Sequence, residues 1–371
     1  MSDSATFDAV VAGHICLDLI PRIAAAPPAG VPVVRPGGLT QVGPAITSTG
    51  GAVSNTGLAL HRLGVPTRLI GRIGDDLFGR EVVRILAEES PALAGGMRVV
   101  PGETTSYSVV VAPPTIDRAF LHCPGANDSF SSTDIDFDVV ADARLLHFGY
   151  PPIMRRMYED GGQDLARLLG EARRRGITTA LDLCSIDPSA PAGRADWQGI
   201  FVRASTLLDL FMPSIDELLA ALRRPAIDLS HPPPISLLRD LADEFLRAGV
   251  AVIVLKLGHH GLYARATGHP QRLATGGRAL AGLNRADWLD RECVAPAFQA
   301  DFVNANGAGD CAIAGFLAAV LRGESLDAAL TAAAATGAVA CESPNANTVP
   351  HWSQIRARID AGWNRRVADH A

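Results

Sequence analysis

The chain has 371 residues, of which 48% are hydrophobic and 19% charged, so it can form a globular core as one large domain or two. Its formal net charge of -6 gives no reason to expect nucleic acid or an anionic membrane as a partner. The six cysteines are scattered and include no Cys-x-x-Cys pair, which disfavours a disulfide-rich or zinc-binding protein. The N-terminus has no basic segment and no apolar run reaches membrane-spanning length, which disfavours a secretory or transmembrane protein. We therefore expect a cytoplasmic protein.

Segments with strand and helix patterns alternate along the chain. In chain order, the patterns predict strand 8–13, helix 54–63, strand 67–73, helix 77–88, strand 144–149, helix 161–175, strand 177–183, helix 216–223 and strand 250–256. This alternation is typical of a parallel sheet covered by helices on both faces, which binds ligands beyond the carboxyl ends of its strands. Asp18, the turn after Gly149 and Asp182 are expected at such ends.

Three irregular segments interrupt the alternation. Residues 19–49 are rich in proline and glycine, and residues 96–122 include a clear strand. Taken alone, these two segments are also compatible with ordinary surface hairpins. Residues 267–295 have the pattern of an elaborated hairpin, in which Trp288 and Arg291 have no role that the sequence assigns.

A turn of small residues, Gly307-Ala308-Gly309-Asp310, opens directly into an apolar helix. The first amides of a helix lack internal partners and carry the positive end of its dipole, so they can hold a phosphate beside the Asp310 carboxylate. This pattern indicates phosphoryl transfer, although a glycine turn with a capping aspartate is also a common structural feature. The turn fits a dinucleotide-binding pattern as well, but the alanine-rich helix expected at 326–340 replaces the strand that such a site requires.

A second pattern lies near the N-terminal end. Gly50 and Gly51 precede Asn55, an amphipathic helix, a glycine stop, a strand and a Gly-Asp-Asp turn. This run closely resembles the N-terminal signature of the ribokinase-like (phosphofructokinase B type) carbohydrate kinases, and the Gly-Ala-Gly-Asp helix resembles their C-terminal signature. Both occur in the family's order, and further matches extend the resemblance over roughly residues 8 to 352.

The resemblance implies a three-layer α/β ribokinase-like fold with a central, mostly parallel sheet and a small β-lid. Residues 1–371 would form a single kinase domain, with the lid built from the inserted segments 19–49 and 96–122. In this family the lid often also makes the dimer contact, so a homodimer through the lid is expected.

The resemblance also implies a reaction, the ATP-dependent phosphorylation of a hydroxyl group on a sugar or sugar-like molecule, with Mg²⁺ on the nucleotide. Asp310 would be the general base, and the helix N-terminus at Gly307, Ala308 and Gly309 would form the anion hole for the transferring phosphoryl group. The remaining roles are substrate binding for Asp18, Gly50, Gly51 and Asn55, nucleotide binding for Lys256 and Gly258, and orientation of Mg²⁺ through water for Glu217.

These residues also have ordinary structural explanations. Lys256, the only lysine in the sequence, could be a surface residue, and Glu217 could lie on a solvated helix face. Asp18 could stabilise a strand-end turn, and Asn55 could cap a helix. A P-loop kinase is excluded, however, because Gly-Lys-Ser/Thr occurs nowhere in the chain.

Several positions depart from the family pattern. Asn304 replaces an aspartate that in relatives helps bind an activating monovalent cation, which makes such a cation doubtful here. Ser214 replaces the asparagine of an Asn-x-x-Glu motif. Ala52 and the pair Gly149-Tyr150 stand at or near positions where ribokinases have a sugar-contacting lysine and glutamate, so ribose is not the favoured acceptor.

Three functions remain open at this point. The leading hypothesis is a sugar kinase, and the second is a nucleoside kinase of the same fold. The third is a sugar-binding or regulatory protein that has lost catalysis, against which the intact Asp310 and its glycines argue. The sequence does not identify the acceptor.

Overall fold

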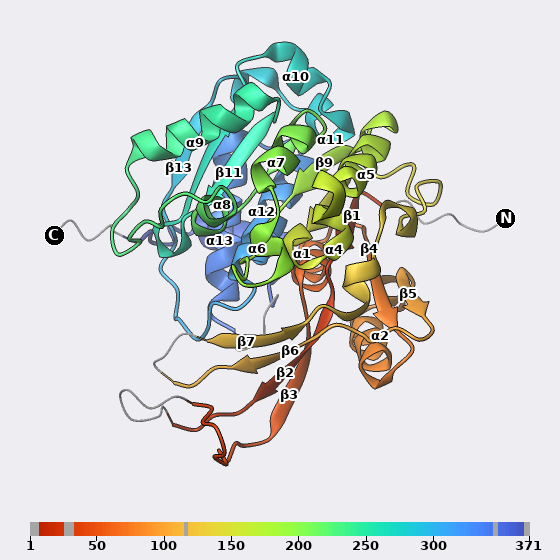
Figure 1. Ribbon diagram of the computed structural model, residues 1–371. Coiled ribbons are helices and arrows are strands. Elements are labelled where there is room, and N and C mark those ends of the chain that lie inside the picture. Colours follow the sequence, from red (N-terminus) through yellow and green to blue (C-terminus); the bar gives the residue numbers. More distant parts are fainter. Residues whose placement is uncertain (1–6, 26–32, 115–117, 344–347, 367–371) are drawn as a thin grey trace.

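The computed structural model describes residues 7–25, 33–114, 118–343 and 348–366, and a nine-stranded sheet runs through its centre (Figure 1). In spatial order its strands are β13 (Glu292–Ala295), β12 (Leu262–Ala266), β11 (Val252–Lys256), β10 (Leu210–Phe211), β9 (Thr178–Leu181), β8 (Leu145–Gly149), β1 (Ala9–Gly13), β4 (Thr67–Gly74) and β5 (Met97–Val100). All neighbours pair in parallel except β11 with β12 and β12 with β13. The predicted mostly parallel sheet is therefore confirmed.

Helices cover both faces of this sheet. One face shares a hydrophobic cluster with α1 (Ala52–Arg62), α2 (Leu77–Glu89), α3 (Pro91–Ala94), α10 (Pro270–Ala274), α11 (Gly277–Ala281), α12 (Ala308–Leu321), α13 (Leu326–Ala340) and α14 (Trp352–Asp360). The other face packs against α4 (Arg155–Tyr158), α5 (Gln163–Arg174), α7 (Trp197–Ser205), α8 (Ile215–Ala221) and α9 (Ile235–Ala248), with the short α6 (Pro191–Arg194) beside α7. Short 3-10 turns complete the chain at η1 (Gly125–Ser129), η2 (Ser132–Asp134), η3 (Pro151–Ile153), η4 (Glu159–Gly161), η5 (Gly258–His260) and η6 (Arg285–Asp287).

The apolar strands form because both of their faces are buried. In β1, Ala9 and Val11 belong to the core on one side of the sheet, whereas Val10 and Ala12 belong to the core on the other. This division follows from the alternation of side chains along a strand. It explains why these strands read as continuous apolar runs rather than as alternating patterns.

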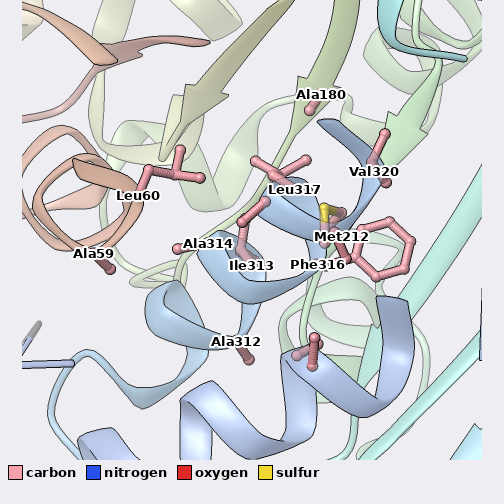
Figure 2. Packing of buried hydrophobic residues seen from close by; sticks show 14 of the residues in the cluster. Ala59, Leu60, Ala180, Met212, Ala312, Ile313, Ala314, Phe316, Leu317 and Val320 are labelled. Carbon is pink, nitrogen blue, oxygen red and sulfur yellow. The ribbon is translucent and has the colours of Figure 1, made fainter. Parts of the chain in front are cut away.

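Helix α12 is the most deeply buried helix of the layer that carries the predicted signature. All of its residues from Asp310 to Leu321 are buried, and Figure 2 shows Ile313, Phe316 and Leu317 among side chains of α1 and the sheet. A Cβ at Gly315 would lie 2.8 Å from the carbonyl oxygen of Ala332 in α13, so the small residues let the two helices pack closely. Burial on all sides fixes the position of the helix's first turn.

A separate four-stranded sheet forms the lid. Its order is β3 (Ala45–Gly50), β2 (Cys16–Pro21), β6 (Tyr107–Val111) and β7 (Ala119–Cys123), and Figure 1 shows these strands together at one end of the main sheet. The predicted α/β fold with a small β-lid is confirmed. Residues 26–32 and 115–117 of the two predicted lid segments lie outside the described residues.

Two boundaries differ from the sequence-based expectation. The lid segment predicted to begin at 96 begins later, because β5 pairs with β4 and is the edge strand of the main sheet. Asp18 does not end the first strand of the main sheet but lies within β2 of the lid. The reason is that the chain leaves β1 after Gly13 and enters the second sheet at Cys16.

The irregular segment 267–295 is an elaborated hairpin in which helical turns connect the antiparallel strands β12 and β13. Trp288 is buried, and its indole nitrogen donates to the carbonyl oxygen of Glu324 at 3.0 Å. Arg291 forms an ion pair with Asp327 at 2.8 Å, so both residues attach the hairpin to the start of α13. Among the helices of the described ranges, none is both long and apolar enough to cross a membrane.

Candidate active site

The candidate site lies where the strand order of the main sheet reverses. The chain passes from β1 to β4 on one side and returns to β8 on the other, which is where open α/β sheets bind ligands. Gly13 and Gly149 are register partners at this point, and a Cβ on Gly149 would collide with Ala52 at the start of α1. The absence of a side chain at Gly149 lets α1 approach the carboxyl end of β8, and Gly13 packs directly against the Gly149 backbone.

Asp310 lies in the first turn of α12 and is only 4% exposed. Its Oδ2 accepts hydrogen bonds from Asn55 Nδ2 at 3.0 Å and from the Tyr150 hydroxyl at 2.7 Å. Its Oδ1 accepts from Thr56 Oγ1 at 3.3 Å. Three donors from two other elements thus hold a buried carboxylate at a helix N-terminus.

Sequence reasoning missed two of these three donors and expected a different contact for the third. Asn55, predicted to bind substrate, directs its amide to Asp310. Thr56 follows it on the buried face of α1, and only the fold shows that this face meets α12. Tyr150 follows the strand-end Gly149, a position that the sequence marked only as a departure from relatives.

The first turn of α12 has the backbone shape of an anion site. Gly307 adopts φ 69° and ψ 2° at the N-cap, a left-handed conformation that glycine accommodates without strain. The Gly307 carbonyl already accepts the Cys311 amide at 2.9 Å, and the Ala308 amide makes a longer contact of 3.3 Å to Ala305. Because the first amides of an α-helix have no partner within the helix, the start of α12 is a place where an anion can bind next to Asp310.

Two of the predicted substrate-binding residues, Asp18 and Gly50, lie on strands of the lid. Asp18 is buried in β2, and a Cβ at Gly50 on β3 would collide with its carboxylate. Cys16 Sγ donates to Asp18 Oδ1 at 3.3 Å, and burial raises the pKa of Asp18 to about 6. Gly51, with φ 84°, lies directly against His14, so it too must remain without a side chain.

His14 lies between β1 of the main sheet and β2 of the lid, next to Tyr150. The centroid of its ring lies 5.1 Å from the ring centroid of His122 and 5.9 Å from the ring centroid of Tyr150. Burial, with a smaller effect of His122, lowers the pKa of His14 well below its ordinary value, so the ring is neutral. The Ser106 hydroxyl donates its single proton to the Cys123 carbonyl oxygen at 2.8 Å. Its oxygen lies 3.4 Å from His14 Nε2 and can therefore only accept a hydrogen bond from that nitrogen, which assigns the ring proton to Nε2. His14 Nδ1 then carries a lone pair, and it is buried without a hydrogen-bond partner in the described part of the chain.

Lys256 ends β11 and lies next to the first turn of α12. Its Nζ lies 2.8 and 2.9 Å from the two carboxylate oxygens of Asp182 at the end of β9. Burial alone lowers the pKa of Lys256, but the neighbouring carboxylates, Asp182 foremost, raise it above its ordinary value and keep the ammonium group charged. A Cβ at Gly309 would lie 3.6 Å from Nζ, so this charge is adjacent to the first turn of α12. Gly258 follows in the turn η5 with φ 58°.

Glu217 lies in the first turn of α8. Its Oε2 accepts a hydrogen bond from the Ser214 amide at 3.0 Å, and the Ser214 side chain accepts one from the Glu217 amide, so the two residues form a capping box. Ser214, which replaces the family's asparagine, therefore caps the start of α8. Burial raises the pKa of Glu217. The described ranges contain no group of three or more His, Cys, Asp or Glu side chains that could hold a metal ion. These residues fit a Mg²⁺ ion bound mainly through phosphates and water, with one carboxylate orienting it.

Asn304 is tied to the protein backbone. Its Nδ2 lies 3.3 Å from the Ser343 carbonyl oxygen, to which it donates, and its Oδ1 accepts the Asn306 amide. A side-chain amide therefore directs a donor toward a carbonyl oxygen that a cation could otherwise coordinate. The buried carboxylate of Asp310 thus lies at a helix N-terminus, with the ammonium group of Lys256 next to the same helical turn.

The sequence matches the model of the pfkB family carbohydrate kinase over residues 8–353. The probable chloroplastic fructokinase-6 of Arabidopsis thaliana is 31% identical over 90 residues, which span 24% of this chain and 23% of that relative. An uncharacterized sugar kinase of Archaeoglobus fulgidus is 23% identical over 269 residues, 72% of this chain and 87% of that protein.

Solved structures share the fold over nearly the whole chain. An Arabidopsis thaliana ribokinase complexed with ribose and ATP has a TM-score of 0.69 at 18% identity and covers 95% of this chain and 98% of its own. A putative ribokinase II from E. coli, in complex with ATP and Mg²⁺, has a TM-score of 0.68 at 20% identity, with coverages of 96% and 99%. The nucleoside kinase of Methanocaldococcus jannaschii has a TM-score of 0.64 at 16% identity, with the same coverages.

Proposed function

The chain belongs to the pfkB family of carbohydrate kinases, and we propose that it phosphorylates a hydroxyl group of a sugar or sugar-like acceptor with ATP, using Asp310 as the general base. The observation that carries this proposal is the placement of the Asp310 carboxylate. It is 4% exposed, held by three donors and located in the first turn of a 14-residue helix. The helix amides supply an anion site next to the base, which is what phosphoryl transfer requires.

In the proposed step, the acceptor hydroxyl gives its proton to Asp310 while its oxygen forms a bond to the γ-phosphorus of ATP. The bond between that phosphorus and the β–γ bridging oxygen breaks, and ADP leaves with the bonding electrons. The amides around Gly307, Ala308 and Gly309 stabilise the charge on the transferring group. The lid residues Asp18 and Gly50 hold the acceptor, since a carboxylate accepts hydrogen bonds from hydroxyl groups.

The nucleotide is proposed to bind on the Lys256 side of the helix start. The charged Nζ beside Gly309 supports a role for Lys256 near the phosphates, and the open turn at Gly258 supports close approach of the nucleotide. Glu217 would orient Mg²⁺ through water, and its half-buried position, with an electrostatic interaction with Lys256, supports this role. When bound, Mg²⁺ neutralises charge on the phosphates and holds them in line.

A nucleoside acceptor is the second candidate. The neutral rings of His14, His122 and Tyr150 lie together on the acceptor side, and planar bases stack on such rings. A protein that only binds sugar is the third candidate. Incubation with ATP, Mg²⁺ and a panel of sugars and nucleosides, read as ADP release, separates the three, with Asp310→Asn as the background control. Release above background with sugars supports the first proposal. Binding of a panel compound without release contradicts it.

We propose further that residues 1–371 act as one kinase domain that dimerises through the lid. Ile46 on β3 and Leu121 on β7 are 57% and 61% exposed, so the lid presents apolar side chains that a second copy of the chain could cover. Sedimentation of the wild type and of Leu121→Asp tests this, because a charge in an apolar interface should shift the protein to monomer. A wild type that is monomeric at all accessible concentrations contradicts the proposal.

A further inference from the structure

Tyr150 has an unusual backbone for its residue type. It adopts φ 69° and ψ 42°, in the left-handed region that side chains other than glycine seldom occupy. Of the four such residues in the described chain, the other three (Asp160, Arg223 and Asp290) are exposed. Tyr150 stands between the closely packed Gly149 and Pro151, in a strained conformation of the kind that clusters at functional sites.

The ring of Tyr150 is fixed in one direction. It stacks on the neutral ring of His14, with an interplanar angle of 29°. Burial raises the pKa of Tyr150 well above its ordinary value, and the charge of Asp310 raises it further. The phenol therefore keeps its proton, and this proton is donated to Asp310 Oδ2 over 2.7 Å, the shortest of the three hydrogen bonds to that carboxylate.

The distribution of donors distinguishes the two oxygens of Asp310. A carboxylate oxygen has two lone pairs, and those of Oδ2 are used by Asn55 and Tyr150. Among the described residues, Oδ1 receives only the longer contact of 3.3 Å from Thr56, so one of its lone pairs remains unused there. The geometry thus leaves Oδ1 as the oxygen that can accept a proton from an acceptor hydroxyl.

We infer that Tyr150 is a positioning residue for the general base, and that its hydroxyl fixes Asp310 so that Oδ1 receives the acceptor's proton. This inference rests on the proposed function of Asp310. Tyr150 contributes in two ways, because its hydrogen bond orients the carboxylate and also stabilises the ionised form that acts as a base. The strained backbone serves to hold the hydroxyl at that oxygen.

The test compares Tyr150→Phe with Tyr263→Phe, measured as ADP release from ATP and Mg²⁺ with the best acceptor of the panel. Tyr263 is fully buried, whereas Tyr150 is half-buried, and the Tyr263 hydroxyl likewise donates to a carboxylate, that of Glu292 at 3.2 Å in the hairpin of β12 and β13, so it serves as the control. Tyr150→Phe keeps the ring and its packing. Its kcat should fall by about tenfold or more, the usual effect of losing a hydrogen bond to a charged group, with little change in the KM for ATP.

The pH profile separates positioning from packing. In Tyr150→Phe the acid limb of kcat should move to higher pH by about half a unit to one unit, because the ionised base has lost a donor. Tyr263→Phe should leave both kcat and the profile unchanged. An unchanged acid limb in Tyr150→Phe overturns the inference, whether kcat is retained or falls together with the melting temperature.

Asp310→Asn distinguishes this failure from failure of the proposed function. If Asp310→Asn is inactive while Tyr150→Phe resembles the wild type in rate and profile, only the positioning role is overturned. If Asp310→Asn retains wild-type turnover, the base assignment is wrong and the inference about Tyr150 falls with it.

Discussion

The two sheets of this kinase are built from similar residues but in opposite surroundings. Strand β11 of the main sheet is buried at every residue, whereas four of the five residues of lid strand β7 are exposed. The main sheet has helices on both faces, and the lid stands apart from it (Figure 1). The proposed site draws on both, since Asp310 belongs to the helical body and Asp18 to the lid. We therefore expect the body to determine stability and chemistry, and the lid to determine acceptor binding.

The largest difference should appear in unfolding. Leu317 is fully buried in α12 (Figure 2), and Leu317→Ala should lower the free energy of unfolding by about 2–5 kcal/mol through lost burial and a residual cavity. Leu121 in the lid is 61% exposed in the single chain, so Leu121→Ala should change the free energy of unfolding of the monomer by at most about 0.5 kcal/mol. Urea denaturation measures both. Equal losses would show that the lid is part of the same cooperative core.

The chemistry should depend on the body alone. Asp310→Asn should lower kcat by at least about two orders of magnitude, the usual contribution of a general base, and leave folding and nucleotide binding nearly intact. Steady-state kinetics and nucleotide titration measure these effects. Retention of more than about a tenth of wild-type turnover, with chemistry rate-limiting, contradicts the assignment.

Acceptor recognition should depend on the lid. Asp18→Ala should raise the KM of the acceptor by about 10- to 150-fold, as expected for a lost hydrogen bond to a charged group, and barely change that of ATP. Hydrogen exchange with and without acceptor should show added protection in β2, β3, β6 and β7 as the lid closes. Unchanged protection with acceptor demonstrably bound contradicts the lid role, and equal losses of ATP and acceptor affinity indicate a folding defect instead.

A smaller effect should follow from pH. Burial raises the pKa of Asp18 to about 6, above its ordinary value, so the folded protein protonates this group below pH 6 and ionises it above. The folded state then binds more protons than the unfolded chain between about pH 4 and 6, and this contribution to stability decreases as pH rises through that window. The KM of the acceptor should decrease over the same rise, since the ionised carboxylate accepts hydrogen bonds better. Asp18→Asn should remove this pH dependence, and its persistence in the variant would assign it to another group.

The smallest effect should be that of potassium. Asn304 lacks the charge of an aspartate and directs its amide to the Ser343 carbonyl, so turnover should change by less than about twofold when potassium is added at constant ionic strength. Asn304→Asp provides the comparison, because it restores a negative charge at this position. A large, saturable activation of the wild type would show that backbone carbonyl oxygens suffice to bind the cation.

The sequence alone determined those features that arise from neighbouring residues. Apolar runs predict the buried strands of the main sheet, because a strand covered on both faces needs no polar side. Gly307 and Asp310 predict the start of α12, because glycine allows the left-handed turn and the helix begins directly after it. The order of the two signatures indicates the family.

The tertiary structure alone decided which side chains meet. Asn55 and Tyr150 reach Asp310 from positions 255 and 160 residues away, and Lys256 reaches Asp182 across 74 residues. The edge strand β5 is likewise assigned to the main sheet only by its pairing with β4. Local patterns contain no information about such distances, because they depend on how α1, α12 and the sheet pack against one another. The packing of these elements, and not any motif, places three donors around one carboxylate.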